Sequence, residues 1–325
     1  MGEVPERYRD RPKGGKTPIL GQRFGRARTL AAALLLVGLA CQQGPATEAE
    51  NPAAAEGSSK GPRTDRMTDG AMAIGQSDAE TAPAGGKGAR SGTVERLSIK
   101  ILAVYPHDPG AFTQGLVWDG GMLYESTGLY GKSSLRRVEP ISGEVLERRL
   151  VDPNLFGEGL ALVDDRLLQL TWKAGIVLVY DLATLELIDE YGFNGEGWGL
   201  AYDGHRLVMS DGSSRLTLRD LDDFRWRATV EVQLEGKPVI HLNELELAEG
   251  ELYANVWGQE RIVRMDPDTG TVNAVIDAAS LLSRDERARV DVLNGIAYDP
   301  VSKTFWLTGK FWPKMFQVVF VPSAP

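Results

Sequence analysis

One sequence pattern occurs five times in this 325-residue chain: a polar or aromatic residue next to a glycine or an acid, followed by an apolar run. Aligned on Gly115, Gly159, Gly199, Glu244 and Gly295, the copies are "FTQGLVWDGGMLYESTG", "FGEGLALVDDRLLQLTW", "GWGLAYDGHRLVMSDG", "LNELELAEGELYANVW" and "LNGIAYDPVSKTFWLTG". The intervals between the aligned positions are 44, 40, 45 and 51 residues. Such a period is typical of repeat folds, in which each repeat is one supersecondary unit that packs against its neighbours.

Each copy has the pattern of a β-hairpin, because two alternating apolar segments flank a turn such as Asp-Gly. Two more alternating segments follow in the first four copies, but the fifth copy is followed only by "MFQVVFV". Four strands per repeat indicate the blade of a β-propeller. The alternating segment "ERLSIKILAVYPH", residues 95–107, precedes the first copy and can supply the missing strand. We therefore predict an all-β, five-bladed propeller over residues 94–325, closed where this strand joins the outside of the last blade, residues 293–320.

Residues 279–293, "ASLLSRDERARVDVL", lengthen the last interval and are expected to form a helical or irregular insertion.

Residues 1–41 resemble an export signal. The apolar stretch "LAAALLLVGLA" follows three arginines and, at 11 residues, is shorter than the roughly 20 that a membrane-spanning helix needs. Cys41 comes directly after Leu-Ala, as in the lipobox of bacterial lipoproteins, and Gln42 behind it favours the outer membrane. A plain signal peptide with an incidental cysteine is the alternative. We expect an exported protein of the cell envelope that contacts the membrane only through a lipid on Cys41.

Residues 42–93 contain no aromatic residue, leucine or valine, so they are predicted to be a disordered tether. The formal net charge of the chain is −9, and residues 1–40 hold eight basic and three acidic side chains, so the rest of the chain stands at −14. This acidic balance argues against nucleic acid or an anionic membrane as the main partner. A monomer is expected.

Equivalent residues of successive blades converge on the centre of a propeller. The positions directly before the aligned residue are occupied by Gln114, Glu158, Trp198, Asn243 and Asn294. A purely structural position would repeat one residue type, whereas this set holds a carboxylate, three amides and an indole. It resembles the lining of a site for one small polar molecule.

Trp172, Trp257 and Lys310 follow the second strands of their repeats, near the same rim. Each tryptophan alone is as well explained by packing between blades. Three of them, Trp172, Trp198 and Trp257, beside Glu158 and Lys310 favour a lined pocket. The three histidines lack metal-ligand spacing, and there is no G-x-S-x-G motif and no cysteine beyond Cys41. The chemistry is therefore expected to depend on carboxylate, amide and ammonium groups. No cofactor is expected to be required, although a structural divalent ion in the channel is compatible with the sequence.

These residues resemble the plant-type glutaminyl-peptide cyclotransferases, a family that also occurs in bacteria. The likeness covers roughly residues 100–320 and is carried by "AFTQGL", "YESTGLYGKSSL", "FGEGLA", "LTWK", "GWGLAYDG", "SDGSS", "LNELE", "ANVWG", "VLNGIAYD" and "TGKFWP". The resemblance implies a five-bladed propeller and conversion of the N-terminal glutamine of peptides or proteins to pyroglutamate, with loss of ammonia. It also implies that Glu158 is the catalytic acid and that Phe156 belongs to the same motif. By the same resemblance, Trp172, Trp198 and Trp257 wall the pocket, and Gln114, Asn243 and Lys310 make polar contacts.

The residue types suit this reaction. The α-amine of the substrate attacks its own side-chain amide, so the protein needs only to hold a folded conformer. One carboxylate, Glu158, can take a proton from the attacking nitrogen and give one to the leaving nitrogen. Asn243 or Lys310 can stabilise the oxyanion, or Lys310 can pair with Glu158 and keep it ionised. Asn294 is placed among the substrate-binding residues.

Two other functions stay open on the sequence alone. A propeller lactonase would hold a divalent metal ion with Glu158, Asn243 and Asn294. A non-catalytic envelope propeller would bind a peptide or a protein partner.

Overall fold

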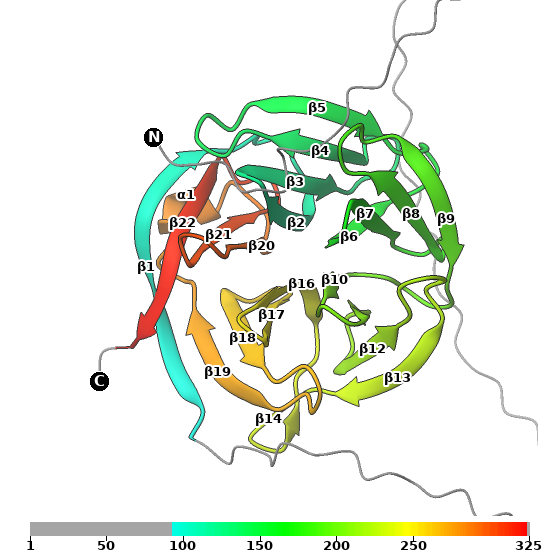
Figure 1. Ribbon diagram of the computed structural model, residues 1–325. Coiled ribbons are helices and arrows are strands. Elements are labelled where there is room, and N and C mark those ends of the chain that lie inside the picture. The colour runs from blue at the N-terminus through cyan, green and yellow to red at the C-terminus, as the bar shows by residue number, and fades with distance from the viewer. Residues whose placement is uncertain (1–92, 324–325) are drawn as a thin grey trace, which may run out of the picture. The chain divides into compact units, whose positions relative to one another are not determined.

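The computed structural model describes residues 93–323, and the predicted export signal, Cys41 and nearly all of the tether lie outside this range. The described part is all-β apart from one short helix, and its sheets surround a common centre like the blades of a propeller (Figure 1). The first sheet contains β2 (Thr113–Asp119), β3 (Met122–Thr127), β4 (Ser134–Val138) and β5 (Val145–Leu150). The second contains β6 (Gly157–Val163), β7 (Arg166–Thr171), β8 (Ile176–Asp181) and β9 (Leu187–Gly192). The third contains β10 (Leu200–Tyr202), β11 (Leu207–Ser210), β12 (Arg215–Arg219) and β13 (Trp226–Glu231).

The remaining strands form one eight-stranded sheet. In spatial order it contains β16 (Leu242–Ala248), β17 (Glu251–Val256), β18 (Arg261–Met265), β19 (Val272–Asp277), β1 (Glu95–Pro106), β22 (Lys314–Pro322), β21 (Thr304–Gly309) and β20 (Leu293–Asp299). The predicted closure is confirmed, since β1 pairs antiparallel with β22 along most of its length. The start of β1 also pairs parallel with β19, from Glu95 opposite Ala274 to Ser98 opposite Asp277. This second pairing was not predicted, and it joins two groups of four strands into one sheet.

The hydrophobic core of the described residues is divided among five clusters, each between two neighbouring groups of strands. Leu160 and Leu178 of the second sheet, for example, pack with Val117 and Leu135 of the first. This division follows from the strand pattern, because each sheet has two apolar faces and must cover both. The stability of the ring is therefore spread over many interfaces.

The repeated glycine is explained by packing between the innermost strands. A Cβ added to Gly159 would lie 2.6 Å from the backbone nitrogen of Leu200 in the next sheet, closer than real Cβ contacts allow. The fourth copy has Glu244 instead, and its carboxylate accepts hydrogen bonds from the backbone N–H groups of Leu116 in β2 and Ile296 in β20. In the fourth repeat, hydrogen bonds between the Glu244 side chain and two other innermost strands thus take the place of the close backbone contact seen at Gly159.

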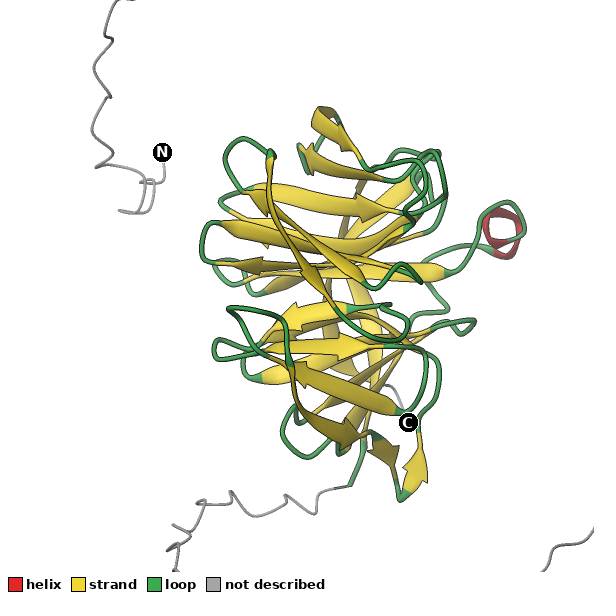
Figure 2. Ribbon diagram, turned by 90° about the vertical axis from the view of Figure 1, so that its right-hand side faces the viewer, coloured by secondary structure: helices red, strands yellow, loops and turns green. Residues whose placement is uncertain are grey.

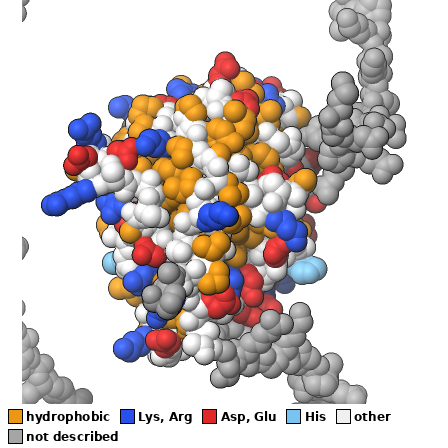
Figure 3. Space-filling view, turned by 90° about the vertical axis from the view of Figure 1, so that its left-hand side faces the viewer, with side chains coloured by type: hydrophobic (Ala, Val, Ile, Leu, Met, Phe, Trp, Pro, Cys, Tyr) orange, Lys and Arg blue, Asp and Glu red, His pale blue; other side chains and the backbone are white. Residues whose placement is uncertain are grey.

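The connection from β19 to β20 contains the short helix α1 (Arg284–Arg287), as the sequence predicted, and Figure 2 shows α1 standing away from the sheets. A small hairpin of β14 (Gln233–Leu234) and β15 (Lys237–Pro238) was not predicted. Figure 3 views the side that carries β1 and β22, where hydrophobic side chains form a band; the large exposed ones of β1 are Ile101, Leu102 and Val104. None of the helices within residues 93–323 is long and apolar enough to cross a membrane.

Candidate active site

Polar side chains near the starts of three innermost strands form a chain of hydrogen bonds. The Nε2 of Gln114 in β2 donates to Oε1 of Glu158 in β6 at 2.9 Å. The Nδ2 of Asn294 in β20 donates to Oε1 of Gln114 at 3.3 Å and to the carbonyl oxygen of Thr113 at 3.0 Å. All three side chains are buried. The structure thus brings Gln114, Glu158 and Asn294 together, as their equivalent positions in the repeats predict.

The electrostatic surroundings of Glu158 favour its protonated form. Burial raises the pKa of this carboxyl well above its ordinary value, the positive charge of Lys310 lowers it in part, and the negative charge of Glu196 raises it further. A carboxyl group with a raised pKa keeps its proton to a higher pH than an ordinary glutamate does, and enzymes use such shifts to tune carboxyl groups for proton transfer. Glu158 is therefore the candidate for proton transfer at this site.

Lys310 follows β21 and is buried, with its Nζ 4.6 Å from the centroid of the Phe112 ring. Burial lowers the pKa of Lys310, while the charge of Glu158 opposes this shift. The ion pairs of the described residues include none between Lys310 and Glu158. The two groups therefore influence each other through space without direct contact.

Two amide oxygens at the site lack a hydrogen-bond partner among the described residues. They are Oδ1 of Asn243 and Oδ1 of Asn294, both fully buried. A buried acceptor without a partner is costly and uncommon in folded proteins. Both residues stand at the rim end of an innermost strand, so this rim holds two buried acceptors without a partner among the described residues.

Aromatic side chains form two groups of contacts near this polar floor. Phe112 and Phe156 lie 6.0 Å apart between ring centroids, Phe156 and Trp172 lie 5.6 Å apart, and Trp198 and Trp257 lie 6.2 Å apart. Phe156 and the three tryptophans of the sequence analysis thus belong to two contact groups at one rim, and Phe112 extends the first group toward Lys310.

Glu196 joins the two aromatic groups and was missed in the sequence. Its Oε2 accepts hydrogen bonds from the indole Nε1 of Trp172 at 2.8 Å and of Trp198 at 3.1 Å. Its Oε1 lies 3.6 Å from Nζ of Lys173, whose ammonium group lies 4.0 Å from the centroid of the Trp172 ring. The available signal was the charged residue between two glycines in "GEGWG", just before an innermost strand.

The loops at the rim contain strained backbone. Leu129, His241 and Phe311 have φ values of 88°, 67° and 61°, in the left-handed region that residues other than glycine seldom adopt. Gly212 has φ 80°, and a Cβ on it would lie 2.7 Å from Cη2 of Trp198. Such strain is found at binding and catalytic sites, but here it is not confined to the rim, since Asp164, Glu249 and Lys303 have positive φ in hairpin turns.

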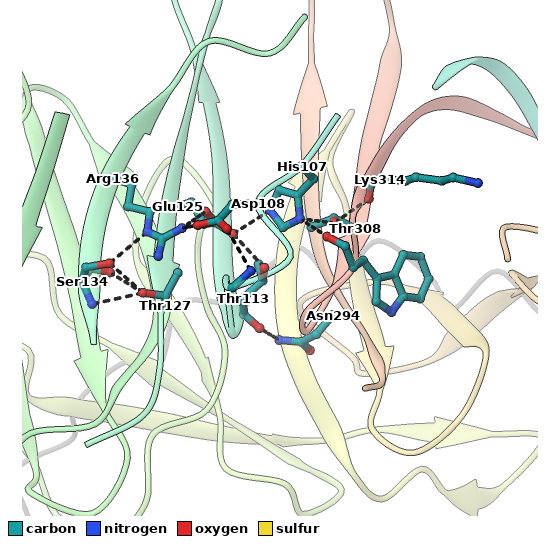
Figure 4. Close-up of polar contacts among 12 residues, drawn as sticks. His107, Asp108, Thr113, Glu125, Thr127, Ser134, Arg136, Asn294, Thr308 and Lys314 are labelled. Atoms are coloured by element: carbon teal, nitrogen blue, oxygen red, sulfur yellow. Dashed lines mark hydrogen bonds and ion pairs between the residues drawn. The ribbon is translucent and has the colours of Figure 1, made fainter. Parts of the chain in front are cut away.

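A buried ionic network supports the floor from the side of the first sheet (Figure 4). Glu125 in β3 accepts hydrogen bonds from Oγ1 of Thr113 at 2.7 Å and Nε2 of His107 at 3.0 Å, and it lies 3.6 Å from the guanidinium of Arg136. Despite its burial, these cations and the Thr113 hydroxyl lower the pKa of Glu125 below its ordinary value, so it is ionised. Because the carbonyl of Thr113 receives the amide of Asn294, the network holds one wall of the site in place.

Within residues 93–323, no group of three or more His, Cys, Asp or Glu side chains is placed to hold a metal ion. Fold and site together define a propeller-like all-β protein with a buried carboxylate beneath an aromatic rim.

Comparisons with known proteins identify the family. Residues 71–320 match the family model described as glutamine cyclotransferase. The chain is 41% identical over 225 residues to the glutaminyl-peptide cyclotransferase of Arabidopsis thaliana, an alignment that covers 68% of this chain and 70% of the plant protein. The crystal structure of Myxococcus xanthus glutaminyl cyclase matches with a TM-score of 0.67 at 39% sequence identity, and it covers 71% of this chain and all of the solved chain. The chain belongs to the glutamine cyclotransferase family.

Proposed function

We propose that this protein is a glutaminyl-peptide cyclotransferase, which converts the N-terminal glutamine of peptides or proteins to pyroglutamate and releases ammonia. The observation that carries the proposal is the buried Glu158, whose pKa is raised, beneath an aromatic rim in a chain of this family. The family match favours neither a metal-dependent lactonase nor a non-catalytic binding propeller.

The reaction forms one C–N bond and breaks another. The neutral α-amine of the substrate attacks the carbon of its own side-chain amide, and Glu158 takes the proton that the amine loses. Glu158 then gives this proton to the leaving nitrogen, which departs as ammonia. Because both reactants belong to one residue, binding it in a folded conformation supplies much of the rate enhancement.

The unsatisfied amide oxygens suggest a division of labour. We assign Oδ1 of Asn243 and Oδ1 of Asn294 to N–H groups of the substrate, because both atoms are acceptors without a partner. We assign stabilisation of the developing oxyanion to Lys310, because its buried ammonium group is the nearby cation whose charge lowers the pKa of Glu158. Gln114 links Glu158 to Asn294 and keeps the carboxylate oriented.

The first test is ammonia release from a glutaminyl dipeptide by the purified protein, with pyroglutamate identified by mass spectrometry. We expect turnover that persists in EDTA, because the proposed chemistry uses no metal ion. A folded protein that releases no ammonia contradicts the proposed function, and loss of activity in EDTA that calcium restores contradicts the metal-free mechanism.

The pH dependence of kcat is expected to move in opposite directions in two variants. Glu196→Gln removes a negative charge that raises the pKa of Glu158, so the acidic limb of the profile should move to lower pH. Lys310→Met removes the cation that lowers this pKa, so the limb should move to higher pH, together with a loss of rate. Shifts in the same direction, or no shift in either variant, would contradict the role of Glu158 as the titrating base.

The role of the Trp198 ring in substrate binding can be tested by a substitution at Gly212. In Gly212→Ala the new methyl group meets the indole ring and the backbone stays in the left-handed region, so the ring must move. We expect KM for a glutaminyl dipeptide to rise by about two- to tenfold with a smaller change in kcat, since one aromatic contact is worth about 0.5–1.5 kcal/mol. Gly236→Ala is the control, because Gly236 also has a positive φ (76°) but its Cβ would meet nothing within 4 Å. Equal effects of the two substitutions would argue against a binding role for Trp198.

We also propose the finer points of architecture and location. The three four-stranded sheets and the two groups of four strands that meet at β1 support a count of five blades. We expect a monomer that needs no cofactor. Cys41 is proposed as the acylated residue of an exported cell-envelope lipoprotein; metabolic labelling with a fatty acid should mark the wild-type protein and not Cys41→Ser.

A further inference from the structure

A groove of about 450 Å³ lies between the second and third sheets, lined by the end of β9 and by the outer strands β12 and β13. Figure 1 shows these strands at the outer side of the ring, whereas the proposed active site lies at its innermost strands. Phe193, Arg219, Phe224 and Trp226 are among the residues that line the groove. None of them has a role in the proposed reaction.

Arg219 occupies a position that the other repeats fill with uncharged side chains. In the first four repeats, one residue near the end of the third strand lies opposite a leucine near the start of the second strand. Arg219 pairs with Leu207 in this way, and the corresponding residues of the first, second and fourth repeats are Val138, Tyr180 and Met265. The repeat architecture therefore does not require a cation here.

The guanidinium of Arg219 is buried without an anionic partner. The residue is 7% exposed, Nη1 donates to the carbonyl oxygen of Phe224 at 3.3 Å, and Nε has no partner among the described residues. Burial lowers the pKa of Arg219, and no carboxylate of the described residues counters this shift. An unpaired buried charge is strongly destabilising unless something compensates it.

Two aromatic residues of the same repeat also line the groove. Phe224 adopts φ 59° at a turn position that is Gly143 in the first repeat, Leu185 with φ 52° in the second and Gly270 in the fourth, and its ring centroid lies 5.2 Å from the Arg219 guanidinium. Trp226 begins β13 where the outer strands of the other three repeats begin with Val145, Leu187 and Val272, and 62% of Trp226 is exposed. A strained aromatic residue, an exposed indole and an unpaired cation thus meet at one surface groove.

The second repeat provides an internal comparison. Its corresponding residue, Tyr180, donates its hydroxyl to Oε1 of Gln169 at 3.2 Å and so is satisfied within the protein. Arg219, in contrast, makes one hydrogen bond to the carbonyl oxygen of Phe224, and its Nε has no partner among the described residues.

We propose that this groove binds a carboxylate ligand with an apolar or aromatic body. The carboxylate pairs with the guanidinium of Arg219, and the body lies against Trp226 and the Phe193 ring, whose centroid is 5.6 Å from the guanidinium. Arginine is suited to this role because its planar fork matches a carboxylate and its face stacks on aromatic rings. The ligand is either a small free acid or the C-terminal carboxylate of a peptide.

The test uses phenylacetate and the purified protein in a carboxylate-free buffer, with binding measured by calorimetry and by the rise in the unfolding temperature. We expect saturable binding to the wild type and at least about tenfold weaker binding to Arg219→Met, which takes the residue that the fourth repeat carries. Arg215→Met removes an exposed cation from the same strand, and this variant should bind phenylacetate as the wild type does. Trp226→Val, again a residue from an equivalent position, should weaken binding. Because Arg219 lies outside the proposed active site, ammonia release by all three variants should match the wild type and report correct folding.

An N-acetylated dipeptide ending in phenylalanine, compared with its C-terminal amide, distinguishes the two ligand sources. Binding of the acid form and not of the amide assigns the groove to peptide C-termini, and binding of phenylacetate alone assigns it to small acids. Absence of binding by all probes, or equal binding of phenylacetate to the wild type and Arg219→Met, would overturn the proposal. The binding outcomes do not depend on whether the protein is a cyclotransferase, because the unfolding temperatures of the variants also report their folding.

Discussion

Replacing Glu158 with glutamine is expected to lower kcat for a glutaminyl dipeptide by about 10² to 10⁴, because the substitution removes the proton acceptor and donor but keeps its shape. Gln114 can still donate to the remaining carbonyl oxygen, so the floor of the site should persist. Ammonia release under saturating substrate measures the effect. Wild-type turnover in the variant would exclude Glu158 as the general base.

The same substitution is expected to stabilise the protein at neutral pH. Since the folded state raises the pKa of Glu158, this carboxyl contributes stability below its ordinary pKa, and that contribution is lost as pH rises through the raised value. The unfolding temperature of Glu158→Gln should therefore equal that of the wild type near pH 4 and exceed it near pH 8. A variant that is less active and more stable at pH 8 separates loss of chemistry from loss of fold.

Replacing Glu125 with leucine is expected to cost about 3–5 kcal/mol of stability, because it leaves the buried Arg136 and His107 without the carboxylate between them. The measurement is the free energy of unfolding in urea. Glu147→Leu is the matched control: it also removes a strand glutamate paired with arginines, but on the partly exposed outer strand β5, and it should cost about 1 kcal/mol or less. A Glu125→Leu variant as stable as this control would show that the buried network of Figure 4 contributes little to the fold.

Much of the site could be predicted because a propeller converts sequence equivalence into spatial proximity. Gln114, Glu158 and Asn294 stand at equivalent positions of their repeats, and the structure joins them by hydrogen bonds. Glu196 lies two residues before Trp198, the residue at the equivalent position of its repeat. The loop that contains Glu196 has no counterpart in the repeat pattern, so no alignment could place it between Trp172 and Trp198.

The network around Glu125 was beyond sequence reasoning for a related reason. His107 follows the first strand, Glu125 lies in β3 and Arg136 in β4, and their contact depends on the twist and register of separate elements. In the sequence these charged residues look like ordinary strand residues. Only the packing shows that they are buried and that their charges compensate one another.

The sequence by itself determined the number and order of strands in each repeat, the pairing of the N-terminal strand with the last strand and the family, because strand period, turn residues and repeat spacing are local properties. The tertiary structure alone decided the second pairing of β1 with β19, the raised pKa of Glu158 and the unpaired state of Arg219. These properties depend on which atoms are buried together and which charges lie near one another. The spacing of residues along the chain does not determine distances across the ring.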